Sequence, residues 1–100
     1  MKRQPVTGIL WWKPDQWKKA KKISTDSHVF DDNYQEWKEG AENALRELQK
    51  RRLIVYQIEI NFNDFLEWCK SEKLELNGAA RSRYVSMKVK ERHESEAENE

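Results

Sequence analysis

The densest group of side chains that could do chemistry lies between residues 26 and 32. One imidazole and three carboxylates lie within these seven positions: Asp26, His28, Asp31 and Asp32. Mixed nitrogen and oxygen ligands of this kind suit a divalent metal, which would make the chain a small metal-dependent hydrolase. The spacing lacks the central glycine and terminal glutamate of a calcium loop. We therefore favour a helix-capping loop, with Asp31 or Asp32 as the cap, and keep the metal site as an alternative.

A second group lies in the segment 78–83, which opens a predicted helix. Its small residues leave backbone N–H groups accessible, so that together with an arginine they could hold a phosphate or a carboxylate. The repeated glycines and the lysine of a phosphate loop are absent from this segment. A simpler interpretation is that Asn77 caps the helix and Arg81 pairs with a glutamate. The candidate anion-binding residues are Gly78, Arg81 and Arg83, with a further basic patch at Lys13, Lys18 and Lys19.

The chain contains five tryptophans, an unusual number for 100 residues. Trp17 and Trp37 fall on the apolar faces of predicted helices, so we expect them in the core. Trp11 and Trp12 are neighbours in a predicted strand and point to opposite sides, so we expect one of them to be exposed at an interface.

The single cysteine, Cys69, is the one thiol that could act as a nucleophile. It lies in the middle of an amphipathic helix beside Trp68, whereas reactive thiols favour helix N-termini and cationic neighbours. We expect a buried core residue. No cofactor is predicted.

Charge alternates along the chain in blocks. Residues 1–22 carry seven bases and one acid, 23–48 two bases and seven acids, 49–93 ten bases and six acids, and 94–100 four acids, giving a net charge of +1. Such blocks pair with one another or with solvent, so nucleic-acid binding is an alternative that we do not favour.

The lone thiol, the lack of a signal-peptide pattern and the lack of an apolar run of roughly 20 residues predict a cytoplasmic protein without a membrane span.

Hydrophobic periodicity predicts an α/β fold with the order strand, helix, helix, strand, helix, helix. Pro14 fits the first turn of a helix. In the loop after that helix, Val29 and Phe30 are expected to pack into the core. Asn63 and Asn77 are expected to cap the last two helices. The predicted strands span 6–12 and 53–60, and the predicted helices span 14–23, 32–51, 64–72 and 78–92. We expect one compact domain over 1–93 and a disordered acidic tail over 94–100.

Two strands joined through helices are expected to lie parallel, in a small sheet covered by the four helices. A two-stranded sheet has two unpaired edges, and the second strand is neither short nor strongly charged. These edges and the surplus of tryptophan favour a non-enzymatic binding or regulatory module that acts through protein contacts, as a homodimer or with another protein.

Several motifs resemble those of a family of short uncharacterised bacterial proteins. They are the Trp17 helix, Asp26, the Asp31-Asp32-x-Tyr34-x-x-Trp37 segment, Trp68-Cys69 and the Asn77-Gly78-x-Ala80-Arg81-x-x-Tyr84 segment. The resemblance covers about residues 9 to 90. It implies a similar compact fold and no particular substrate or catalytic residue.

Overall fold

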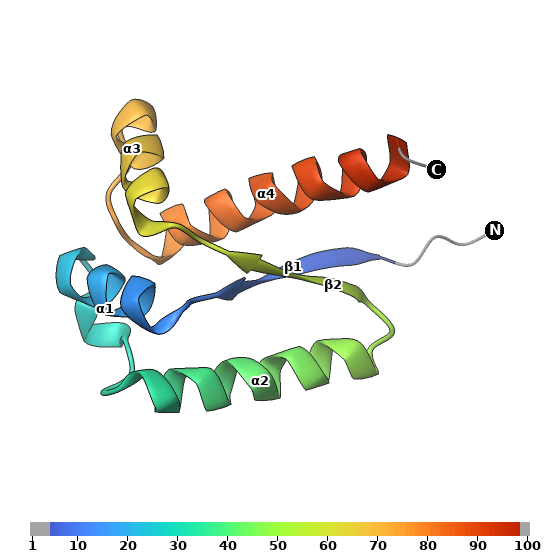
Figure 1. Cartoon of the computed structure of the whole chain (residues 1–100), viewed down its shortest axis with the longest axis horizontal. Coiled ribbons are helices and arrows are strands. Elements are labelled where there is room, and N and C mark those ends of the chain that lie inside the picture. The colour runs from blue at the N-terminus through green and yellow to red at the C-terminus, as the bar shows by residue number, and fades with distance from the viewer. Residues whose placement is uncertain (1–4, 99–100) are drawn as a thin grey trace.

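Two parallel strands and four α-helices, in the predicted order, make up the part of the chain that this computed structural model describes, residues 5–98 (Figure 1). The α/β fold is therefore confirmed. The elements are β1 (Val6–Trp11), α1 (Pro14–Ile23), a short 3-10 helix η1 (Ser27–Val29), α2 (Tyr34–Lys50), β2 (Ile54–Glu59), α3 (Phe62–Glu72) and α4 (Gly78–Glu98). Within these residues, no helix combines the length and apolar character that a membrane span requires.

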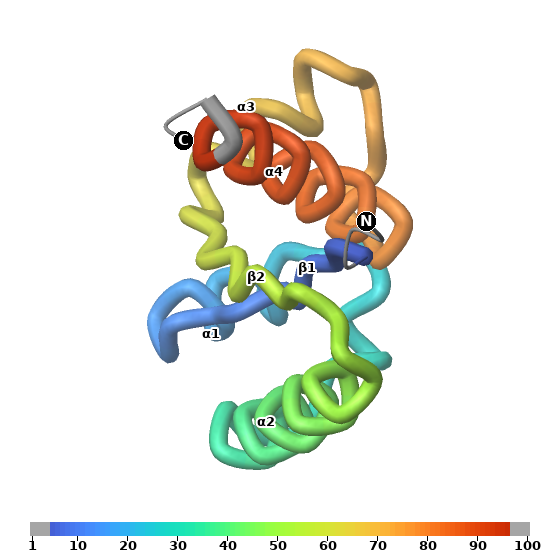
Figure 2. Tube along the Cα trace, turned by 90° about the vertical axis from the view of Figure 1, so that its right-hand side faces the viewer, coloured from blue at the N-terminus to red at the C-terminus, as the bar shows by residue number. Residues whose placement is uncertain are grey.

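The sheet lies between two long helices. Figures 1 and 2 show α4 on one face of the strands and α2 on the other. Tyr56 and Ile58 point toward the α4 face and are buried, whereas Gln57 and Glu59 alternate with them and are exposed. This alternation is the period-two pattern of the sequence. The main core continues from the α4 face to α1 and α3, and its buried members are Trp12, Trp17, Ala20, Tyr56, Ile58, Ile60, Phe62, Phe65, Cys69, Ala80, Tyr84 and Val85.

Close packing of α4 onto the sheet depends on Gly8. A Cβ atom at this position would overlap Cγ2 of Val89 and would lie 3.1 Å from Cγ1 of Val85. The missing side chain therefore lets α4 approach the backbone of β1 directly. This approach positions the groove described below.

The helix caps differ in part from the predictions. Asn33, and neither Asp31 nor Asp32, caps α2 by accepting a hydrogen bond from the N–H of Glu36 at 2.9 Å. Asn61 replaces Asn63 as the cap of α3, because Phe62 is already helical and buried in the core. Asn77 does accept a hydrogen bond from the N–H of Ala80.

Two large apolar residues are exposed, and the sequence predicts one of them, Val29, to lie in the core. Val29 is 63% exposed and Ile23 48% exposed. Val29 lies in η1, whose tight turn directs it outward, while Phe30 beside it packs against Trp17 as predicted. Ile23 is the last residue of α1, and the buried position after it is taken by Ser24.

Helix α4 is six residues longer than predicted and continues through residues 94–98, which lie in the expected tail. The hydroxyl of Tyr56 donates a hydrogen bond to Oε2 of Glu96 at 2.7 Å, and Arg92 lies 3.6 Å from Oε1 of the same carboxylate. These contacts give the acidic end of the chain a partner on β2. Residues 1–4 and 99–100, the ends of the predicted domain and tail, lie outside the described residues.

Candidate functional site

Each strand of the sheet has one edge without a neighbouring strand in the described structure. The N–H of Ile54 donates to the carbonyl of Pro5 at 2.9 Å, which fixes the alternation of the ladder. In a parallel pair with this register, every second residue turns its N–H and C=O toward the partner strand and the others turn them outward. The outward residues are Val6, Gly8 and Leu10 on β1, and Val55, Gln57 and Glu59 on β2.

A groove of about 810 Å³ runs along the outer edge of β1, between the strand and α4. We call it the β1 groove. Its wall on α4 is apolar in the middle, at Val85 and Val89, and basic at one end, at Lys90 and His93. None of the described residues that line it is acidic. The full lining is residues 6–10 of β1 and Gly78, Arg81, Ser82, Val85, Ser86, Val89, Lys90 and His93.

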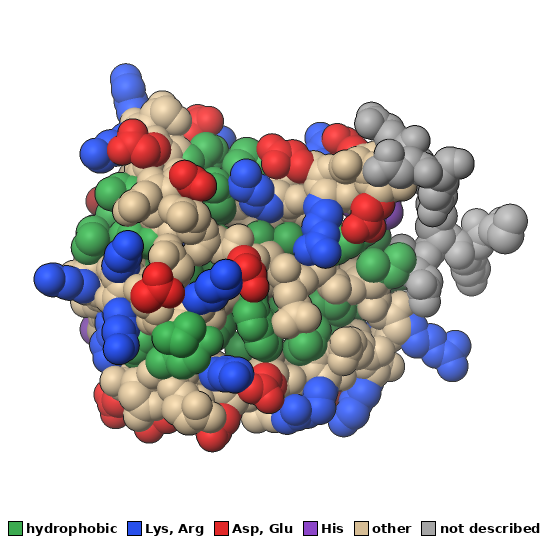
Figure 3. All heavy atoms as spheres, viewed as in Figure 1, with side chains coloured by type: hydrophobic (Ala, Val, Ile, Leu, Met, Phe, Trp, Pro, Cys, Tyr) green, Lys and Arg blue, Asp and Glu red, His purple; other side chains and the backbone are tan. Residues whose placement is uncertain are grey.

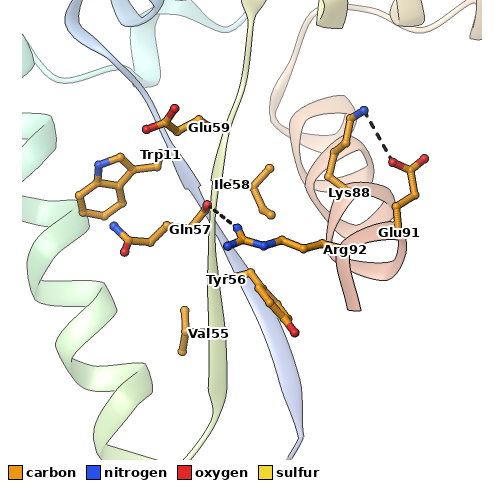
Figure 4. Close-up of a pocket in the computed structure, with 9 residues that line it drawn as sticks. All are labelled: Trp11, Val55, Tyr56, Gln57, Ile58, Glu59, Lys88, Glu91 and Arg92. Carbon is orange, nitrogen blue, oxygen red and sulfur yellow. Dashed lines mark hydrogen bonds and ion pairs between the residues drawn. The ribbon is translucent and has the colours of Figure 1, made fainter. Parts of the chain in front are cut away.

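A second groove, of about 790 Å³, lies along the outer edge of β2; we call it the β2 groove (Figure 4). Arg92 reaches across it from α4 and donates a hydrogen bond to the carbonyl of Gln57 at 3.4 Å. Lys88 pairs with Glu91 at 3.7 Å on the same helix. Figure 3 shows this side of the molecule, with hydrophobic side chains between the charged side chains of α4 and α2. The β2 groove therefore carries both signs of charge, and one of its outward carbonyls is already occupied.

Asp26 and Arg81 form the most buried ion pair of the described residues. Their side chains are 20% and 11% exposed, and Nη2 of Arg81 lies 2.7 Å from Oδ2 of Asp26. The N–H of Gly78 donates to the same oxygen at 2.9 Å. Hydrogen bonds from Arg81 lower the pKa of Asp26 below its ordinary value. Asp26, and not a glutamate, is thus the partner of Arg81.

This pair occupies the predicted anion site with a carboxylate of the chain itself. A phosphate at Gly78 and Arg81 would have to displace Asp26. Arg83 lies 5.8 Å from the ring of Trp68 and Lys13 pairs with Glu59 at 3.7 Å, while Lys18 and Lys19 are exposed on α1. The described contacts do not gather the six predicted anion-binding residues into one site.

The predicted metal ligands are also kept apart. Among the described residues, no group of three or more His, Cys, Asp and Glu side chains is placed to hold a metal ion. Asp26 turns to Arg81, while His28, Asp31 and Asp32 are exposed around η1 and the loop after it. The backbone carbonyls of Asp31 and Asp32 accept hydrogen bonds from Lys21. This segment joins α1 to α2.

Of Trp11 and Trp12, the neighbours expected to place one ring at an interface, Trp12 is buried and Trp11 is half-buried. Trp12 is 1% exposed and packs against Phe62, because the strand ends at Trp11 and the chain turns inward. Trp11 contacts Trp37 of α2 at a ring distance of 5.9 Å and lines the β2 groove.

Cys69 lies in the core, as predicted, with 1% of its surface exposed. Burial raises the pKa of its thiol, which disfavours the nucleophilic thiolate. This placement gives the thiol no route to a substrate.

Sequence reasoning missed the part of α4 that lines the two grooves. The signal was present in the four-residue spacing of Val85 and Val89, with Lys90 and His93 on the following turn. A glycine inside a strand pattern, at Gly8, is the second signal, since it indicates a close approach of another element.

Comparison with known proteins finds no family model, no curated protein and no solved structure that matches this chain. The resemblance to short bacterial proteins stays a prediction.

Proposed function

We propose that this chain is a non-enzymatic binding module that acts through protein contacts, by pairing a strand of its partner with an open edge of its sheet. The observation that carries the proposal is that both outward edges lie in grooves beside α4, so an added strand would find backbone partners and side-chain walls together. Strand addition of this kind draws its affinity from main-chain hydrogen bonds and its specificity from the walls.

Two partner types fit the proposal: a segment of another protein, or a second copy of the chain. A second copy suits the β2 groove best, because Glu59 and Glu91 of one copy could face Lys88 and Arg92 of the other. The cytoplasmic location stays a prediction.

Amide exchange at the outward residues tests the proposal. A library of displayed eight-residue peptides is first screened for binding to the chain. Amide exchange of the chain is then measured with and without the peptides that bind. Separately, the free chain is measured from micromolar to millimolar concentration. We expect protection to rise at the outward residues of one edge, while the inward amides of Thr7 and Ile9 stay protected throughout. If neither peptides nor concentration change exchange at either edge, the proposal is wrong.

A further inference from the structure

We infer that the β1 groove binds an extended peptide that carries an apolar residue followed, two positions later, by a carboxylate. This inference rests on the proposed function, because it selects the edge and states the chemistry of the partner. Four features of the groove support it: its free backbone groups, its apolar wall, its charge and its direction.

The edge of β1 is more open than the edge of β2. Among the described residues, no side chain or backbone group outside the strand is hydrogen-bonded to the outward groups of Val6, Gly8 or Leu10. On β2, Arg92 already bonds the carbonyl of Gln57. A guanidinium across a strand edge hinders further pairing, so a partner strand meets less competition at β1.

The apolar wall stands close beside this edge. Because Gly8 has no side chain, Val85 and Val89 lie directly over the strand, within the lining of the groove. A strand added to β1 would direct every second side chain toward α4, and the central one would meet these valines. An apolar side chain there would remove apolar surface from water on both sides.

The charge of the groove selects against a basic partner and against a second copy. Arg81 is neutralised by Asp26, which leaves Lys90 exposed at the other end, beside His93, whose Nδ1 lies 3.3 Å from the hydroxyl of Tyr56. Two copies joined through β1 about a twofold axis would share these basic walls, with no acid of the described lining between them. A carboxylate of a different chain complements them.

The spacing and the direction follow from helix and strand geometry. Residues four apart on a helix are separated by about 6 Å along its axis, and alternate residues of a strand by roughly 6.5–7 Å. A partner side chain two positions after the one at Val85 and Val89 therefore reaches Lys90 and His93. An antiparallel partner is favoured, because parallel pairing is slightly less stable per residue. Since α4 runs opposite to β1, such a strand carries the acid on the C-terminal side of the apolar residue (Figure 1).

The test uses a synthetic seven-residue probe with blocked ends, Thr-Val-Thr-Val-Thr-Glu-Thr. Two control peptides have lysine in place of glutamate, or the same residues in reverse order. Binding is measured by calorimetry, and the bound edge is identified from amide exchange. We expect the probe to protect Val6, Gly8 and Leu10, and each control to bind about fivefold to tenfold more weakly, as for a partly exposed charge pair.

A charge reversal at Lys90 provides the matched variant. Lys90→Glu should make the lysine peptide the better ligand, whereas Lys70→Glu, on α3 and outside both grooves, should leave the preference unchanged. Equal binding of probe and controls would overturn the inference. Protection at Val55, Gln57 and Glu59 in place of the β1 residues would overturn it too, but would leave the proposed function standing. No protection at either edge by probe, selected peptides or a second copy would refute both.

Discussion

At the scale of single residues, the ion pair between Asp26 and Arg81 holds together segments far apart in the chain. It ties the loop after α1 to the first turns of α4, and Arg81 also lies 5.0 Å from the ring of Phe30. Because both charged groups are largely removed from water, either one alone would be costly. The ion pair therefore stabilises the contact between the two halves of the chain.

Asp26→Asn should lower the free energy of unfolding by about 2–4 kcal/mol, since it leaves the guanidinium of Arg81 buried without its counter-charge. Urea unfolding followed by tryptophan fluorescence measures this. Glu67→Gln is the control: Glu67 pairs with Lys70, but its side chain is 75% exposed, so the change should stay below about 0.5 kcal/mol. Equal losses of stability in the two variants would contradict a stabilising role of the pair between Asp26 and Arg81.

Gly8→Ala should destabilise the chain by about 1–3 kcal/mol, because the added methyl group overlaps the side chain of Val89. The double variant Gly8→Ala with Val89→Ala should recover part of that loss, and calorimetric unfolding would detect the recovery. A double variant that loses the sum of the two single effects would show that the two positions do not contact one another.

At the scale of elements, the C-terminal half of α4 is held by its contacts with β2. The hydroxyl of Tyr56 bonds Glu96 and lies 3.3 Å from Nδ1 of His93, and Arg92 lies 4.9 Å from the ring of Tyr56. One buried tyrosine thus supplies the partner for three polar side chains of one helix. Without it, this stretch of α4 would keep only the contacts of Arg92 with Glu96 and Gln57 beside its helix propensity.

Tyr56→Phe should speed amide exchange over residues 93–98 while leaving the start of α4 protected. The expected loss of stability is about 0.5–1.5 kcal/mol for one hydrogen bond. Tyr34→Phe is the matched control, because it removes a hydrogen bond of 2.7 Å to the carbonyl of Trp12 and leaves α4 untouched. Faster exchange at 93–98 in the control as well would contradict a local role of Tyr56.

The type and order of the helices and strands were predictable, because the spacing of apolar residues along the chain defines them. The fold order, Pro14 at the start of α1 and the alternation of β2 followed directly from the pattern of apolar residues. The ends were harder: α4 continues past residue 92 because Glu96 finds Tyr56, a partner 40 residues earlier. The grooves were not predictable, since they depend on which helix lies over Gly8, and local spacing does not specify that.

At the scale of the whole molecule, Asp26 and Tyr56 contribute to opposite limits of pH stability. The pKa of Asp26 is lowered from 3.8 by its hydrogen bonds with Arg81, so its contribution is present above that value and is lost as the pH falls through the folded pKa. The pKa of Tyr56 is raised from 10.0, chiefly by its hydrogen bond to Glu96. Its contribution is present below that value and is lost as the pH rises through the folded pKa.

Stability measured between pH 2 and pH 11 should therefore fall at both ends. Asp26→Asn should flatten the acid limb selectively, and Tyr56→Phe the alkaline limb. Urea unfolding at each pH, for the unchanged chain and both variants, provides the profile. An acid limb unchanged by Asp26→Asn would show that other carboxylates control it.

The parallel pairing of β1 with β2 also has a consequence for how the chain folds. Val6 lies opposite Ile54, so the first strand has no sheet partner until 48 further residues have been made. Closing so long a loop loses chain entropy before any ladder bond is gained, whereas α1 and α2 can form from local contacts. We therefore expect β1 to stay unpaired during synthesis while the helices form. The sheet is completed late, when β2 has been made and pairs with β1.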